Sequence, residues 1–105
     1  MLVYTITINV EKSVAEEWLL WMKENFLDAV IATNIFEKYH AFKVLHDSEG
    51  DTYTFQFFCK DILNYKKFQD EHKPHIIHKL MTSFPEKVVY FNTLLQQLDV
   101  WYLVN

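Results

Sequence analysis

The chain opens with a strict alternation of large apolar and small polar side chains. In residues 3–10, VYTITINV, the even positions are apolar, and the odd positions from residue 5 onward are threonine or asparagine. Because successive side chains of a β-strand point to opposite faces of a sheet, this pattern predicts a strand that is buried on one face only. A sheet with one apolar face requires a second layer of structure to cover it.

Three further segments have the composition of strands. They are FEKYHAFKVLH at 36–46, TYTFQFFC at 52–59 and KVVYFNTLL at 87–95. DSEGD, at 47–51, lies between the first two and has the composition of a hairpin turn. We therefore expect a sheet of four strands, two of which are joined by a tight hairpin.

Two stretches between these strands have apolar side chains at helical spacing. Ser13, with Glu16 three residues later, predicts a capping box at the start of the first stretch. This helix is expected to change direction near residue 27 and to end at Asn34, which tolerates left-handed angles. The second stretch, residues 61–84, is expected to break at Pro74, because the residue before a proline avoids helical angles.

The resulting order is β-α-β-β-α-β. This order predicts a ferredoxin-like α+β sandwich, in which a four-stranded antiparallel sheet carries its helices on one face. A chain of 105 residues is long enough for one core of this kind, so we expect a single domain over residues 1–105.

Residues 96–105, QQLDVWYLVN, form an apolar extension beyond the last predicted strand. A segment of this composition is not expected to remain in water. We predict that it packs on, or pairs with, a second subunit of a homodimer. The alternative is a fifth strand or a short helix that folds back onto its own domain.

The composition argues against several classes of protein. The net charge is −4 and the basic residues form no dense cluster, which argues against nucleic-acid binding. A chain with one glycine, Gly50, argues strongly against a glycine-rich phosphate loop, and the one cysteine, Cys59, cannot form an internal disulfide. No apolar run reaches membrane-spanning length, and the N-terminus does not resemble a signal peptide. We therefore predict a cytoplasmic protein that contacts neither nucleic acid nor membrane.

Three of the five histidines lie close together in EHKPHIIH, residues 71–78. Helical spacing places His75 and His78 on a polar face, and His72 lies before the proline break. Zinc requires three or four converging ligands, which this arrangement does not provide. We interpret the segment as a solvated helix face that binds metal at most adventitiously, and we predict neither a metal site nor a cofactor.

A ligand-binding or catalytic site is expected on the sheet face that the helices leave open. In the ferredoxin-like strand order this face collects neutral hydrogen-bonding groups among aromatic side chains, as small-molecule pockets do. An ordinary outer sheet face is the alternative. His40 is the candidate general base, because no other group there titrates near neutral pH. Cys59 is expected to be unreactive packing. The predicted ligand-binding residues are Thr5, Thr7, His40, Thr54, Gln56, Tyr90 and Asn92.

Residues 16–36 and 84–95 resemble a small bacterial family of unknown function. Its members carry E-E-W-L-x-W-M-K, then A-T-x-x-F, and later F-x-x-K-V-V-x-F-x-T, and the likeness covers nearly the whole chain. The family's His-Ile-Pro-Asp run is replaced here by FLDA at 26–29. A family reaction that depends on this histidine is therefore not expected in this chain.

More distantly, the chain is similar to the dimeric α+β barrels, in which two ferredoxin-like sheets pack face to face. That superfamily includes cofactor-independent monooxygenases, heme-degrading enzymes, small isomerases and ligand-sensing domains. The resemblance implies a homodimer that encloses the open sheet faces and gives the apolar extension a partner.

The sequence does not specify a biochemical role, and three functions remain open. The first is a dimeric, non-catalytic domain that binds a small, partly apolar molecule between sheet and helices. The second is a cofactor-independent enzyme of the monooxygenase or isomerase type, in which His40 and either Tyr90 or Asn92 orient a substrate. The third is a structural or interaction protein whose sheet face is consumed by dimerisation.

Overall fold

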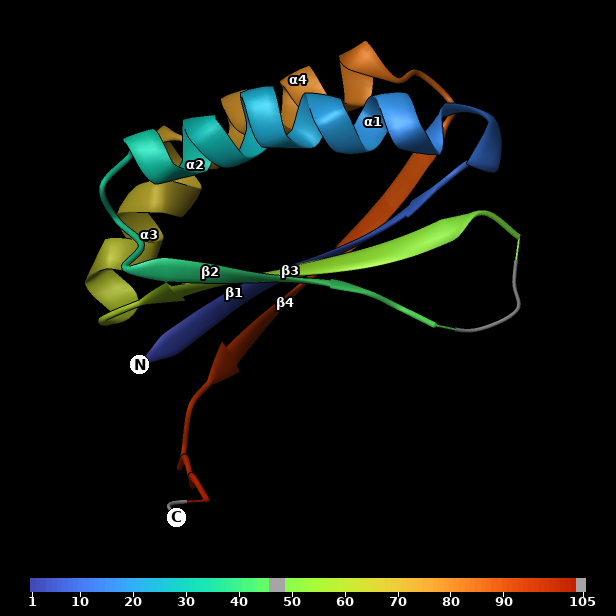
Figure 1. Ribbon diagram of the computed structural model, residues 1–105. Helices are drawn as coiled ribbons and strands as arrows, with labels where there is room; N and C mark the ends of the chain where they lie inside the picture. Colours follow the sequence, from blue (N-terminus) through green and yellow to red (C-terminus); the bar gives the residue numbers. More distant parts are fainter. Residues whose placement is uncertain (46–48, 104–105) are drawn as a thin grey trace.

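The computed structural model describes residues 1–45 and 49–103 of the chain, with the helices above a sheet (Figure 1). The strands are β1 (Leu2–Val10), β2 (Lys38–Lys43), β3 (Asp51–Cys59) and β4 (Val88–Gln96). The helical segments are η1 (Lys12–Val14), α1 (Ala15–Trp21), η2 (Met22–Phe26), α2 (Leu27–Ala32), α3 (Ile62–Glu71) and α4 (Lys73–Ser83).

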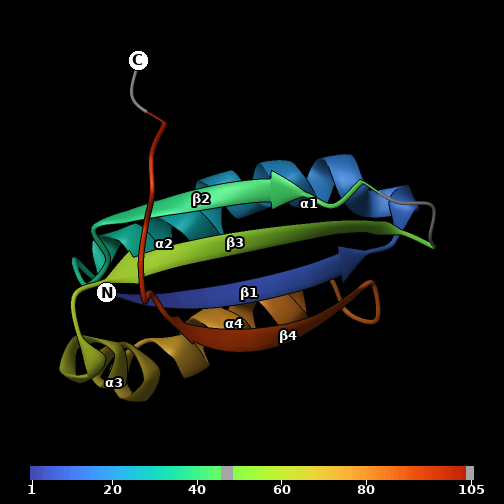
Figure 2. The same ribbon diagram turned by 90° about the horizontal axis from the view of Figure 1, so that it is seen from below.

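The four strands form one antiparallel sheet in the order β2-β3-β1-β4. β1 therefore lies inside the sheet and pairs along its whole length with β3 on one side and β4 on the other. The described helices all lie on one face, with α1 and α2 towards β2 and β3, and α3 and α4 towards the other edge (Figure 2). This arrangement confirms the predicted ferredoxin-like α+β fold.

The alternation in β1 defines the core. Its even-numbered side chains from Tyr4 to Val10 face the helices and are almost fully buried. The register places Phe55 and Phe57 of β3 on the same face, and both are buried. Thr7 and Asn9, on the opposite face, remain half-buried. The period of two in the sequence thus determines which face of the sheet receives the helices.

α1, η2 and α2 form one continuous helical segment. The backbone keeps right-handed helical angles at Met22 and Leu27, so no break occurs near residue 27. A spacing of four residues drifts around an α-helix of 3.6 residues per turn. The π-helical turn η2 is wider, which keeps the stripe against the sheet. The buried residues of this stripe are Trp18, Met22, Phe26 and Val30.

The two helical regions begin in different ways. Ser13 lies in the 3-10 turn η1, and α1 begins at Ala15 without a side-chain cap, so the predicted capping box is wrong. A capping residue needs extended backbone angles, which a residue inside a 3-10 turn does not have. Asp61 does cap α3, since its carboxylate accepts a hydrogen bond of 2.9 Å from the backbone N–H of Asn64.

α3 and α4 are separated at His72, as Pro74 predicted. Pro74 lies in the first turn of α4, where a backbone N–H has no helical partner to lose. Ile76 and Leu80 of α4 are buried, whereas His75 and His78 are exposed, so these two histidines lie on the predicted solvated face. None of the described helices is long and apolar enough to cross a membrane.

The β2–β3 hairpin matches its prediction in part. β2 covers residues 38–43 of the predicted 36–46, and His46 lies outside the described residues. The predicted turn at 47–51 also lies partly outside them. Gly50 has a φ of +75°, and a Cβ there would lie 2.7 Å from the carbonyl oxygen of Val10. Only glycine fits this position without strain. Asn34, at the end of the first helical region, has the expected positive φ of 60°.

Beyond β4, residues 97–103 leave the sheet on its helix-free side and point away from the domain (Figures 1 and 2). The backbone N–H of Gln97 donates to the carbonyl oxygen of Met1 at 2.9 Å, and no regular structure follows within the described residues. The described part of the arm therefore forms neither a fifth strand nor a helix against its own domain.

The packing of α4 gives a direct test of the core. Leu80 is 0% exposed beneath α4, whereas Leu63 of α3 is 75% exposed. We expect Leu80→Ala to lower the free energy of unfolding in urea by about 2–5 kcal/mol, because it leaves a cavity. The matched control Leu63→Ala should change it by no more than about 0.5 kcal/mol. Equal effects of the two variants would contradict this assignment of the core.

Candidate functional site

The open face of the sheet holds five of the seven predicted ligand-binding residues. The register places Thr5 opposite Gln56, Thr7 opposite Thr54, and His40 opposite Gln56. These pairs lie on the face that the helices leave uncovered. The hydroxyls of Thr7 and Thr54 are 3.1 Å apart and share a hydrogen bond. Thr5 is only 8% exposed, and its hydroxyl has no hydrogen-bond partner among the described residues.

Tyr90 and Asn92 lie on the other face, so their predicted place beside the threonines is wrong. β4 pairs Tyr90 with Ile8 and Asn92 with Ile6, both of which face the helices. The hydroxyl of Tyr4 donates a hydrogen bond of 2.8 Å to the side-chain oxygen of Asn92. The apolar run in β4 has no clear alternation, so the sequence did not reveal which residues face the core. The burial of Val88 opposite Val10 determines it.

His40 is exposed at the β2 edge of the open face. Its ring lies 4.9 Å from that of Phe58 and 6.2 Å from that of Phe42, measured between ring centroids. Asn92 is on the opposite face and at the opposite edge of the sheet. Within one chain, therefore, His40 does not form the predicted catalytic set with Tyr90 or Asn92. Its role as a general base stays a prediction.

The open face is almost uncharged, and threonine, asparagine and glutamine side chains lie among its apolar ones. Among the described residues at its outward strand positions, Lys38 is the one with a permanent charge. A sheet face adapted to water usually carries many charged side chains. A hollow of about 210 Å³, partly walled by Thr7, Asn9 and Phe91, lies on this face near β4. The exposed large apolar residues of the open face as a whole are Phe42, Val89, Phe91 and Leu95.

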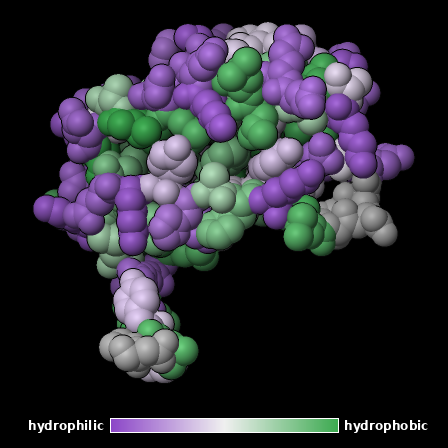
Figure 3. All heavy atoms as spheres, viewed as in Figure 1, coloured by the Kyte–Doolittle hydropathy of each residue, from purple (hydrophilic) through white to green (hydrophobic). Residues whose placement is uncertain are grey.

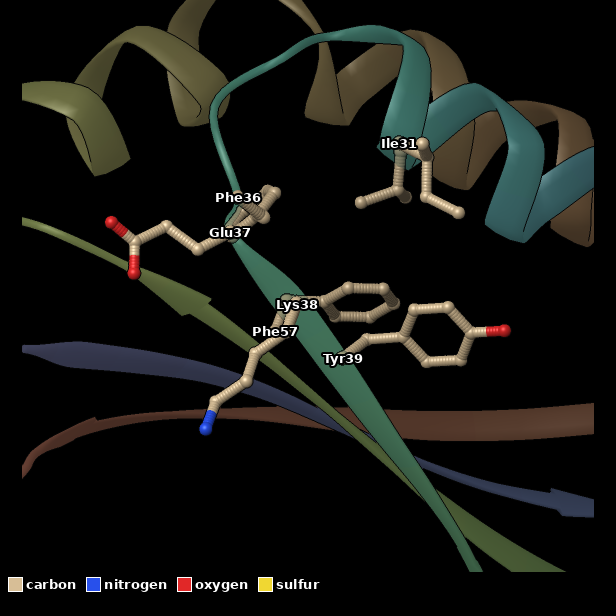
Figure 4. A pocket seen from close by; sticks show the side chains of 7 residues that line it. Ile31, Phe36, Glu37, Lys38, Tyr39 and Phe57 are labelled. Atoms are coloured by element: carbon tan, nitrogen blue, oxygen red, sulfur yellow. The ribbon is translucent and has the colours of Figure 1, made fainter.

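A larger hollow lies between α2 and the β2 edge of the sheet (Figure 4). It has a volume of about 310 Å³. Ile31 points into it from α2, with the rings of Tyr39 and Phe57 below, whereas the charged ends of Glu37 and Lys38 point away. The lining residues are Val30, Ile31, Phe36, Glu37, Lys38, Tyr39 and Phe57.

The walls of this pocket are aromatic and firmly held. The ring of Phe57 lies 5.5 Å from that of Phe36 and 5.8 Å from that of Tyr39, between centroids. Phe57 and Val30 belong to the buried core, so the floor is preformed. Such a pocket suits a small molecule with an apolar, flat body. The sequence did not reveal it, because the lining comes from three separated segments.

No group of three potential metal ligands occurs among residues 1–45 and 49–103. His75 and His78 point to solvent, and His72 stacks on Phe68 with 6.5 Å between ring centroids. The histidine segment therefore contributes nothing to either hollow.

Comparison with known proteins identifies the family. Residues 1–98 match the family described as "Domain of unknown function (DUF4286)". The chain belongs to this family. No curated protein matches its sequence.

Solved structures share the fold of this DUF4286 chain at low sequence identity. A dimeric ferredoxin-like protein from an uncultured marine organism has a TM-score of 0.73 and 11% identity, over 98% of this chain and 100% of the other. HapK from Hahella chejuensis has a TM-score of 0.71 and 10% identity over 100% of both chains. SnoaB, a cofactor-independent oxygenase from Streptomyces nogalater, has a TM-score of 0.69 and 9% identity over 94% of both. These likenesses establish the fold.

Cys59 is buried on the helix side of β3, as predicted for packing. Its thiol donates to the carbonyl oxygen of Asp61 at 3.7 Å, and burial raises the pKa of the thiol. Both features disfavour the thiolate, which is the nucleophilic form. The predicted cytoplasmic location of this DUF4286 chain stays a prediction, with which a free thiol is compatible.

We expect a thiol-specific disulfide reagent at pH 8 to modify Cys59 in the native protein more than about 100-fold more slowly than in concentrated urea, because only opened molecules expose the thiol. The release of the coloured thiolate measures the rate. A native rate equal to the denatured rate would mean that Cys59 is an accessible nucleophile.

Proposed function

We propose that this chain is a homodimeric domain that binds a small, largely apolar molecule in the pocket between α2 and β2. The observation that carries the proposal is the preformed aromatic floor made by Phe36, Tyr39 and Phe57 beneath Ile31. Small-molecule sites are commonly concave, apolar and largely preformed, and they begin at about 300 Å³. The volume of about 310 Å³ suits a ligand of one or two rings.

The chemistry of the rim refines the ligand class. Glu37 and Lys38 carry opposite charges at the mouth and point away from the cavity, so neither is placed to neutralise a buried charge. Tyr39 is the residue of the lower wall with a polar tip, at the end of an otherwise apolar ring. A neutral, flat molecule with one hydrogen-bonding group is the best match.

1-Naphthol is a suitable probe, because it is neutral and has two fused rings and one hydroxyl. We expect it to shift the backbone amide NMR signals of α2 and β2, and Ile31→Asp to weaken its binding about 10-fold or more, since a carboxylate would enter the apolar cavity. Leu20→Asp is the matched control, because Leu20 is an exposed apolar residue of α1 outside the pocket.

Each result of this titration decides whether the pocket between α2 and β2 is the binding site. Weaker binding in Ile31→Asp alone supports the pocket. Equal loss in both variants, or shifts confined to the open sheet face, would exclude it. No binding of 1-naphthol at all would favour the third hypothesis, in which the domain serves assembly alone.

The homodimer is proposed from the open sheet face and the surface area. A compact monomer of 12.7 kDa is expected to expose about 6,200 Å², whereas this chain exposes 7178 Å². The excess of roughly 1,000 Å² is comparable to the ~800 Å² that each partner buries in a standard interface. A second copy that packs face to face would cover the uncharged sheet face. The likeness to a dimeric ferredoxin-like protein supports a homodimer, without specifying which faces pack together.

The C-terminal arm extends towards the same partner. Residues 97–103 leave on the helix-free side of the sheet and stand clear of the rest of the surface (Figure 3). Leu98 is 90% exposed and Trp101 is 79% exposed. Fully extended, these seven residues span about 23 Å, which exceeds the ~10 Å between stacked sheets. The arm is therefore long enough to extend past the interface and contact the side of the second copy that faces away from it.

We expect the full chain to form dimers in solution, and the chain that ends at Gln96 to dissociate about 10-fold or more readily, because it lacks the apolar contacts of the arm. Phe91→Glu should give monomers, since it places a charge in the proposed interface. Leu63→Glu, on the helix layer, is the control and should leave the dimer intact. Light scattering over a range of concentrations measures the mass.

Monomers of the full chain at all concentrations would refute the homodimer. An unchanged dissociation constant for the shortened chain would refute the contribution of the arm to dimerisation, but it would not contradict the proposed sheet-to-sheet contact. Loss of the dimer in Leu63→Glu would place the interface on the helix layer.

An oxygenase role is the second candidate. SnoaB, described as a cofactor-independent oxygenase, has this fold, and a flat aromatic molecule held on the open sheet face beside His40 would be a suitable substrate. The predicted set of His40 with Asn92 is not assembled within one chain, so a catalytic role for His40 requires groups from the second copy. Consumption of dioxygen by the wild-type protein with 1-naphthol, and its loss in His40→Ala, would favour this candidate.

A further inference from the structure

We propose that a second site, at the β4 edge of the sheet beneath the start of α4, binds the carboxylate of a small organic anion through Lys73 and Asn92. The two residues come from elements far apart in the sequence and both contact Tyr4 of β1. This site lies at the opposite edge of the sheet from the pocket between α2 and β2. It is independent of the function proposed above.

Lys73 is a half-buried cation without a counter-ion. Its Nζ lies 5.2 Å from the centre of the Tyr4 ring. The ion pair found among the described residues is Lys87–Glu11, at 2.8 Å, and no described carboxylate lies within 4.0 Å of Lys73. Burial lowers the pKa of Lys73. A cation that is partly removed from water and has no charged partner gains free energy when an anion binds beside it.

Asn92 supplies a second donor on the same side of the sheet. The hydroxyl of Tyr4 donates to its side-chain oxygen at 2.8 Å, which fixes the orientation of the amide. The amide NH2 of Asn92 then donates to no described residue, and the side chain is exposed at the edge. Tyr4 is 1% exposed and its ring is packed among aromatic side chains, so it holds both donors in place.

The groups around the site complement an acceptor. An ammonium and an amide NH2 both need hydrogen-bond acceptors, and a carboxylate offers two oxygens with a negative charge. Tyr90, two residues before Asn92, lies on the same side of β4. The partly exposed Leu94, two residues beyond Asn92, adds an apolar surface. The ligand class is thus a carboxylate with a short apolar or aromatic body.

Benzoate is the probe, and benzamide is its neutral control of the same shape. We expect benzoate, followed through the amide signals of β4 and α4 at low salt, to bind about 10-fold or more tightly than benzamide, because a charge-assisted hydrogen bond contributes more than a neutral one. Lys73→Gln should weaken benzoate binding by about 10-fold or more, and Lys73→Arg should retain it within about 3-fold. Lys66→Gln, which alters an exposed lysine of α3, should leave it unchanged.

Several results would overturn the proposal. They are equal binding of benzoate and benzamide, equal effects of the Lys73 and Lys66 variants, and the absence of shifts in β4. Inorganic phosphate bound as tightly as benzoate would mean that the site recognises charge alone, which contradicts the apolar part of the ligand class. Wild-type thermal stability in Lys73→Arg, with benzoate binding lost, would also overturn it. The 1-naphthol test reports on α2 and β2, so the two sites fail or succeed separately.

Discussion

The alternation of large apolar side chains on one face of β1 is the constraint on which the rest of the structure depends. β1 pairs along all nine residues with both neighbours, so the face chosen for Ile6 and Ile8 is imposed on every residue of β3 and β4. β3 then transmits the same choice to β2. A shift by one residue in the β1–β3 ladder would turn Phe55 and Phe57 away from the helices and turn polar side chains towards them instead.

Both proposed sites are consequences of the limited width of the helix layer. Two rows of helices cover the inner strands well, but β2 is exposed along its whole length and β4 from Phe91 onward. Each edge strand therefore leaves side chains uncovered beside the neighbouring helix. At β2 these side chains line an apolar hollow walled by rings and Ile31. At β4 the exposed Asn92 lies on the same side of the sheet as Lys73, so the proposed site is polar.

The fold could be predicted from the sequence, because the alternation of strands and the residues that begin or end helices are local signals. The alternation of β1, the cap at Asp61, the break at Pro74 and the left-handed angle at Asn34 all act within a few residues. The capping prediction from Ser13 is wrong, because a 3-10 turn moves the N-cap of α1 by one residue, to Val14.

The sites were less accessible to sequence reasoning, because they depend on register and on distant segments. β4 reads VVYF without alternation, so only its pairing with β1 shows that Tyr90 and Asn92 face the helices. Thr5, Thr7, His40, Thr54 and Gln56 were placed on the correct face because their strands alternate. The aromatic pocket and the Lys73 site each join segments separated by many residues, and neither leaves a motif in the chain.

A face-to-face dimer and two edge sites are mutually compatible. A second copy would remove the almost uncharged open face of the sheet, with its exposed apolar side chains, from water. The pocket between α2 and β2 opens beside the helices, and the Lys73 site lies on the helix side of β4, so a partner on the opposite face blocks neither of them directly. In the proposed dimer, an arm that crosses the interface would reach the partner's helix side, where these sites lie. The affinity of an edge site for its ligand and the contact of the arm with the partner are therefore expected to influence each other in the dimer, since both involve the same side of the same sheet.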